Sequence, residues 1–93
     1  MQTELDTILA GLRANIHQET LNHRGPDAGL VTSFAVNLRR HGERINEKLS
    51  NLRARSEAAP HLTAIDAAAG TAATLVNDAI AAAEAAGRVE FAA

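Results

Sequence analysis

The chain changes character at one polar stretch that carries both glycine and proline, Asn22-His23-Arg24-Gly25-Pro26-Asp27-Ala28-Gly29-Leu30. Gly25 and Pro26 stop a preceding helix, and Pro26 suits the first position of the next helix, where its missing N–H is harmless. Asp27 suits the positive N-terminal end of that new helix. We therefore predict a hinge between two helices, with His23, Arg24, Pro26 and Gly29 as its structural residues.

Apolar residues recur at helical spacing on both sides of this hinge and indicate helices at about residues 4–22, 27–58 and 61–86. Two apolar stripes carry most of the large side chains, Leu5, Leu9, Leu12 and Ile16 in the first helix and Phe34, Leu38, Ile45, Leu49 and Leu52 in the second. The expected fold is an all-α, three-helix bundle with a long middle helix, which forms a single domain over residues 1–93.

The expected ends of the helices follow from a few residues. Thr3 is placed to cap the first helix, and Pro60 ends the second, because the residue before a proline avoids the helical conformation. Gly87 is a natural C-cap for the third helix. After it, Phe91 is expected to fold back onto one end of the bundle.

The composition predicts a thin core. The chain has 21 alanines among its 93 residues, two phenylalanines and no tryptophan, tyrosine or cysteine. A core this poor in large side chains gains stability from a partner or from a second copy of the chain, so a homo-oligomer is one expectation. Cysteine chemistry is excluded. The N-terminus does not resemble a signal peptide and the alanine-rich region is interrupted by charges, so we expect a cytoplasmic protein without a membrane span.

Residues that could support catalysis or metal binding are scattered. The histidines are His17, His23, His41 and His61, and only Glu19 with His23 has the spacing of two metal ligands on one helix face. A single pair of this kind is far more often structural than a metal site. No serine has a recognisable base, and no glycine-rich phosphate loop is present. We therefore expect neither an enzyme nor a bound cofactor.

The middle helix carries a ridge of basic side chains, Arg40, Arg44, Lys48 and Arg55. Residues 28–60 hold six basic groups against three acidic ones, although the whole chain has a net charge of −2. Like charges four residues apart on a helix repel one another. Either solvation and neighbouring acids such as Glu19, Asp66 and Asp78 offset this repulsion, or an acidic or phosphate-bearing partner does. Aromatic residues do not alternate with the basic ones, which argues against base stacking on single strands. The net charge of −2 predicts no general attraction to nucleic acid, so direct nucleic-acid binding is not expected.

The hinge resembles a family of small, all-helical phage anti-CRISPR proteins that inhibit type II-C CRISPR effector nucleases. The positions that carry the resemblance are Asn22, His23, Arg24, Pro26, Gly29, Leu30 and Ser33, followed near the C-terminus by Ala79, Ile80, Ala83, Glu84, Gly87 and Val89-Glu90-Phe91. The resemblance implies an inhibitor without catalytic residues that binds the recognition lobe of the nuclease and blocks its engagement of target DNA. The matched positions look architectural, so the family's partner-binding residues do not transfer to this chain.

The sequence thus gives a leading hypothesis and two rivals. The leading hypothesis is a non-enzymatic phage or mobile-element protein that inhibits a CRISPR effector by direct protein contact, through Arg40, Arg44, Lys48 and Arg55. The first rival is a helical structural or adaptor subunit of a phage or other bacterial assembly. The second is an antitoxin or DNA-binding regulator, for which the basic ridge is the sole argument.

Overall fold

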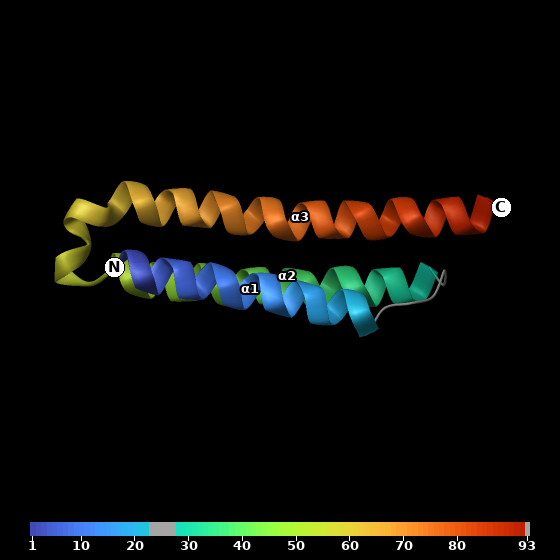
Figure 1. The fold of residues 1–93 in the computed structure, drawn as a ribbon, viewed down its shortest axis with the longest axis horizontal. Coiled ribbons are helices and arrows are strands. Elements are labelled where there is room, and N and C mark those ends of the chain that lie inside the picture. The colour runs from blue at the N-terminus through green and yellow to red at the C-terminus, as the bar shows by residue number, and fades with distance from the viewer. Residues whose placement is uncertain (23–27, 93) are drawn as a thin grey trace.

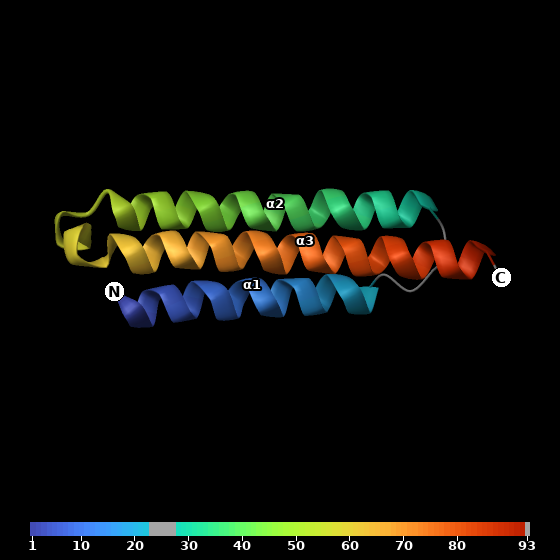
Figure 2. The same ribbon diagram turned by 90° about the horizontal axis from the view of Figure 1, so that it is seen from above.

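The computed structural model describes residues 1–22 and 28–92, and within these ranges it is helical almost throughout and has no strand. The elements are α1 (Gln2–Asn22), α2 (Ala28–Arg53), the short 3-10 helix η1 (Ser56–His61) and α3 (Leu62–Ala92). Each long helix runs antiparallel to the one before it, and together they form a rod of 54 × 18 × 17 Å (Figure 1). Figure 1 and Figure 2 together show α3 lying along both α1 and α2, and these two helices also pack on each other. The predicted all-α bundle is therefore confirmed.

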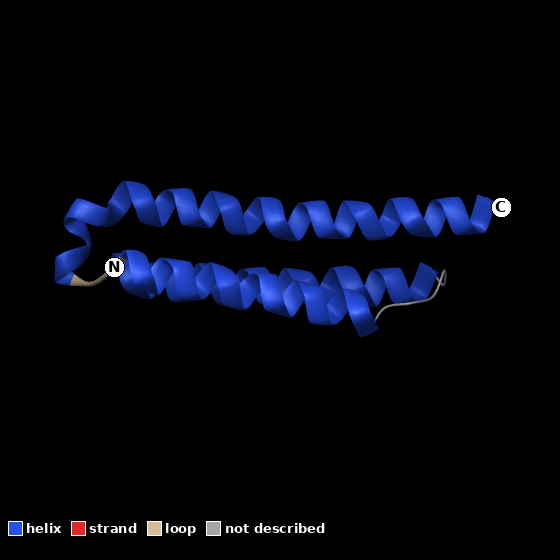
Figure 3. Cartoon of the chain, viewed as in Figure 1, coloured by secondary structure: helices blue, strands red, loops and turns tan. Residues whose placement is uncertain are grey.

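The prediction that the middle helix would be the longest is wrong. The α2 helix has 26 residues and α3 has 31, which at 1.5 Å per residue is about 46 Å. The expected continuation of α2 to Ala58 fails because Arg55 adopts an extended conformation, with φ −72° and ψ 147°. The chain then tightens into η1, which contains Pro60 and begins with a hydrogen bond from the Ala58 amide to the Arg55 carbonyl (Figure 3).

The ends of the other two helices also differ from those predicted. The α1 helix begins at Gln2, so Thr3 lies inside it, and the Thr3 carbonyl accepts a hydrogen bond from the Thr7 hydroxyl at 2.9 Å. The α3 helix passes through Gly87 and continues to Ala92, so Phe91 is part of the helix rather than of a returning tail. Alanine has the highest helix propensity of all residues, and an alanine-rich segment extends a helix past a single glycine.

The core is made entirely of apolar side chains among the described residues, and no polar side chain is buried there. All five large residues predicted for the second stripe are buried, and in the first stripe Leu5 and Leu12 are buried while Leu9 and Ile16 are partly buried. The α3 helix contributes mainly small or branched side chains, Ile65, Ala68, Ala72, Val76 and Ile80. Gly42 of α2 lies against α3, because a Cβ atom there would be 3.4 Å from Cγ2 of Val76. Short side chains thus line the contact between α2 and α3 around Gly42.

The charged residues on each helix limit its apolar length. None of the described helices has a stretch that is long and apolar enough to cross a lipid bilayer.

Candidate functional site: a basic groove between α1 and α2

The surface between α1 and α2 contains two hollows, which together we call the basic groove. The wider one, of about 400 Å³, is lined by Thr3, Glu4, Thr7 and Ile8 from α1 and by Lys48, Asn51, Leu52 and Arg55 from α2 and the segment after it. The narrower one, of about 220 Å³, is lined by Glu19 of α1 and by Asn37, Arg40, His41 and Arg44 of α2. Since Arg40, Arg44 and Lys48 occupy successive turns of α2, the two hollows follow one ridge.

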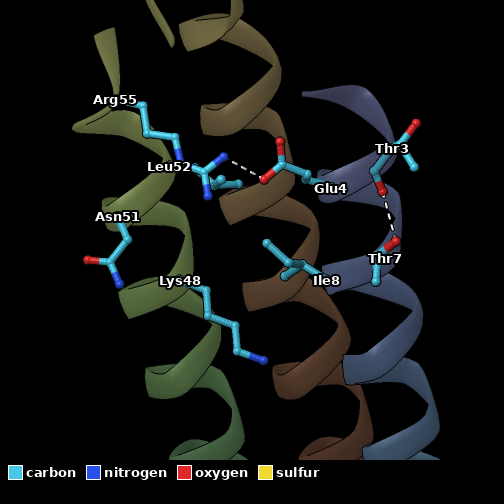
Figure 4. Close-up of a pocket in the computed structure, with 8 residues that line it drawn as sticks. All are labelled: Thr3, Glu4, Thr7, Ile8, Lys48, Asn51, Leu52 and Arg55. Carbon is cyan, nitrogen blue, oxygen red and sulfur yellow. Dashed lines mark hydrogen bonds and ion pairs between the residues drawn. The ribbon is translucent and has the colours of Figure 1, made fainter. Parts of the chain in front are cut away.

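The wider hollow has an apolar base and a charged rim. Ile8 is partly buried and Leu52 is buried, and both pack with the core of the bundle. Lys48 extends from α2 toward α1, and Arg55 reaches across to Glu4 (Figure 4). The Arg55 Nη1 donates a hydrogen bond to Oε2 of Glu4 at 2.7 Å, and a second carboxylate, that of Glu57, lies 3.9 Å from the same nitrogen. The Arg55–Glu4 pair therefore joins the two walls of the hollow.

The narrower hollow is organised around the Glu19 carboxylate. The Nε2 of His41 lies 3.3 Å from Oε1 of Glu19, and the amide nitrogen of Asn37 donates to Oε2 of the same side chain at 3.5 Å. Both contacts are partly buried. The Glu19 carboxylate is thus paired with His41 and Asn37 and not with the basic ridge. Arg40 and Arg44, which line the same hollow, are exposed.

Three of the four predicted binding residues have no acidic partner within the described part of the chain. No described side chain forms an ion pair with Arg40, Arg44 or Lys48, although all three are exposed. Asp66, expected as a partner of the ridge, instead pairs with Arg53 on the other side of α2. Glu19 contacts His41 and not an arginine. Ion pairs among the described side chains therefore do not offset the repulsion along these three turns of α2.

Arg55 belongs to the same groove for a different reason from the one predicted. Helical spacing placed it on the ridge, but α2 ends at Arg53 and Arg55 lies beyond that end. Its contact with Glu4 brings its guanidinium back over the groove. Unlike the other three residues, Arg55 is already paired.

The predicted hinge falls largely outside the part of the chain that the structure describes. His23, Arg24 and Pro26 lie in residues 23–27, which are not described, so their predicted role remains a prediction. Gly29 lies in the first turn of α2. The first residue of α2 that lines the groove is Asn37, eight positions further along the chain.

Sequence reasoning missed the wall that α1 provides. Thr3, Thr7 and Ile8 are distant in sequence from Lys48, and only the antiparallel packing of α1 on α2 brings them together. The contact of His41 with Glu19 joins the same two helices, and the sequence did not predict it. The available signal was the sequence of polar residues Asn37, His41 and Arg44 at helical spacing.

Within residues 1–22 and 28–92, no group of three or more histidine, cysteine or acidic side chains is placed to hold a metal ion. Comparison of the chain with known protein families, curated proteins and solved structures found no match.

Proposed function

We propose that this chain is a non-enzymatic binding protein that attaches to an acidic protein surface through the basic groove. The observation that carries the proposal is the row of three exposed cations, Arg40, Arg44 and Lys48, for which the described part of the chain supplies no counter-charge. Like charges on neighbouring turns destabilise a helix slightly. A partner carboxylate relieves that repulsion on binding, and charge complementarity steers the encounter.

The resemblance of the hinge and the C-terminus supplies the partner that we propose, a type II-C CRISPR effector nuclease bound at its recognition lobe. On this proposal the chain is a phage or mobile-element inhibitor that acts in the cytoplasm of a bacterial host. It would block the nuclease by occupying its surface, which requires no catalytic residue of its own.

The test is a DNA-cleavage assay with purified type II-C effector and increasing amounts of this protein, alongside a direct binding measurement. We expect inhibition of cleavage and a complex that is stable at physiological salt. If the effector remains fully active and does not bind the protein, the proposed target is wrong. A shift of duplex DNA by the protein alone at low salt, where phosphate contacts are strongest, would instead favour a DNA-binding protein.

Charge reversal identifies the surface. The double variant Arg44→Glu with Lys48→Glu should bind the partner about tenfold more weakly or worse, because reversed rim charges repel an acidic surface. Arg39→Glu is the matched control, since Arg39 is an exposed arginine of the same helix that lines the hollow between α2 and α3. Equal binding by the double variant and the control would assign the interface to another face.

A second candidate function, a helical subunit of a phage or other bacterial assembly, is favoured by the length of α3. The α3 helix is ten residues longer than α1, and its C-terminal end projects past both other helices (Figure 2). Ala81, Ala82, Ala85 and Ala86 near that end are exposed. Light scattering coupled to size exclusion separates the two functions, since a ring or large oligomer supports a subunit and a stable monomer counts against it.

A further inference from the structure

The wider hollow of the basic groove differs from the rest of the groove because its base is apolar. Ile8 and Leu52 line it together with the polar residues Thr3, Thr7 and Lys48, and Lys48 extends from α2 toward Ile8 (Figure 4). Leu52 is only 4% exposed and belongs to the core, so the base is fixed by the packing of the bundle. Binding energy at protein interfaces concentrates where a large side chain enters a pocket of this kind within a polar rim.

The charges around this hollow favour an acidic occupant. Lys48 is exposed and forms no ion pair with a described side chain, and it extends over the hollow from α2. At the opposite end, two carboxylates offset two cations. The Nη1 of Arg55 lies 2.7 Å from Oε2 of Glu4 and 3.9 Å from Oε1 of Glu57, and the N-terminal ammonium group lies 3.9 Å from Oε1 of Glu4. The cation that can contact a ligand in this hollow is therefore the ammonium group of Lys48. Arg44 adds a second unpaired cation one helical turn away.

The C-terminal end of this chain does not fill the hollow within one molecule. Thr3 and Arg55 place the hollow at the end of the rod that holds the N-terminus, whereas the C-terminal end of α3 lies at the opposite end (Figure 2). The hollow is therefore open to a segment of another molecule. The charge of its rim indicates the chemistry of that segment.

We propose that the hollow between Ile8 and Leu52 is an anchor pocket for a protein segment that presents a leucine, phenylalanine or tryptophan side chain beside aspartate or glutamate. The apolar side chain rests on Ile8 and Leu52, and the neighbouring carboxylate contacts the Nζ of Lys48. The inference deepens the proposed function and rests on it in one respect, that the partner is a protein with an acidic surface. It adds that an apolar anchor, and not charge alone, determines where the partner binds.

The test uses selection of random peptides displayed on phage against the purified full-length chain. We expect enriched peptides to combine a large apolar residue with aspartate or glutamate close to it. No enrichment, or enriched peptides without acidic residues, would overturn the proposal. If the hollow is instead occupied by a second copy of the chain, light scattering will show a dimer and the peptides will fail to bind, which also overturns it.

Two threonines provide a matched pair of variants for the same peptides. Thr7 and Thr20 are both exposed on α1, and each hydroxyl donates to the carbonyl four residues earlier, at 2.9 and 2.8 Å. Only Thr7 lines the hollow. Thr7→Phe should therefore fill the pocket and weaken binding of the selected peptides at least about tenfold, while Thr20→Phe should leave it within about twofold of the original.

Lys48→Glu gives a second measurement that does not depend on how the new phenylalanine packs. It should weaken binding of the acidic peptides strongly, with Arg39→Glu as its control, and equal binding by both variants would contradict the proposal. The same variants separate this inference from the proposed target. If the effector nuclease binds Thr7→Phe as well as the original protein, the anchor pocket is wrong and the target stands. If the nuclease does not bind at all but acidic peptides bind and respond to Thr7→Phe, the pocket stands and the named target is wrong.

Discussion

The α2 helix has two neighbours, and its two grooves are built differently. Toward α1 it presents Arg40, Arg44 and Lys48, which have no ion-pair partner among the described side chains. Toward α3 it presents Gly42, together with Arg53 that pairs with Asp66 and Arg39 that shares its hollow with Glu43. The hollows on the α3 side are about 250 and 190 Å³, and alanines of α3 line them.

The difference separates packing from recognition on a single helix. On the α3 side, short side chains allow close contact and Arg53 forms an ion pair with Asp66, as suits a contact within a domain. On the α1 side, long cationic side chains surround open hollows, as suits a surface that meets a partner. Paired changes, in which each variant is compared with a second one elsewhere in the bundle, test whether this division is real.

The largest effect is expected from overfilling the contact with α3. Ala72 is 2% exposed and lies beside Gly42, so Ala72→Leu should lower the free energy of unfolding by about 1–3 kcal/mol through overpacking. Chemical denaturation measures the change. Ala81→Leu is the control on the same helix, because Ala81 is exposed and the new side chain has room. An equal and small effect of both changes would mean that α3 is held loosely against α2.

A smaller effect on the free energy of unfolding is expected from adding a methyl group at Gly11 of α1 or at Gly42 of α2. Gly11 of α1 has no atom within 4 Å of a new Cβ, so Gly11→Ala should raise the free energy of unfolding by about 1 kcal/mol through helix propensity. Gly42→Ala should raise it by less, since its Cβ would contact Val76 at 3.4 Å. Thermal unfolding of the two variants gives the comparison. A larger gain from Gly42→Ala would show unfilled space between α2 and α3.

The smallest effect, with opposite signs in the two grooves, is expected from removing single charges. Arg44→Gln removes like-charge repulsion along α2 and should stabilise the protein by a few tenths of a kcal/mol at low salt. Arg53→Gln loses the exposed pair with Asp66 and should destabilise it by about 0–1 kcal/mol. Both differences should shrink at high salt, because ions screen exposed charges. The same sign for both variants would mean that the ridge has counter-charges outside the described residues.

The sequence predicted the face of α2 better than it predicted the ends of the helices. Helical periodicity alone places Phe34, Leu38 and Ile45 on one side, and all three are buried. The ends depend on balances of a few kcal/mol or less between local conformations. For that reason the helical end expected at Gly87 was wrong and α3 reaches Ala92, while the second helix stops before the expected Ala58.

The candidate site was predictable in part for a similar reason. Arg40, Arg44 and Lys48 share a ridge because they are four residues apart on one helix, and a sequence displays that directly. Thr7 and Ile8 join them only through packing between α1 and α2, and Arg55 joins them only through its pair with Glu4. Contacts between residues far apart in sequence leave no periodic signal.

By itself, the sequence determined that the chain is an all-helical bundle, which face of each helix is apolar, and that one ridge of the second helix is basic. These are consequences of the 3.6-residue period of the helix, which fixes directions around a single axis. Only the tertiary structure decided that the ridge borders a groove with an apolar base, that α3 is the longest helix, and that Asp66 pairs with Arg53 rather than with the ridge. These depend on how the helices lie against one another, which the periodicity of any one helix does not contain.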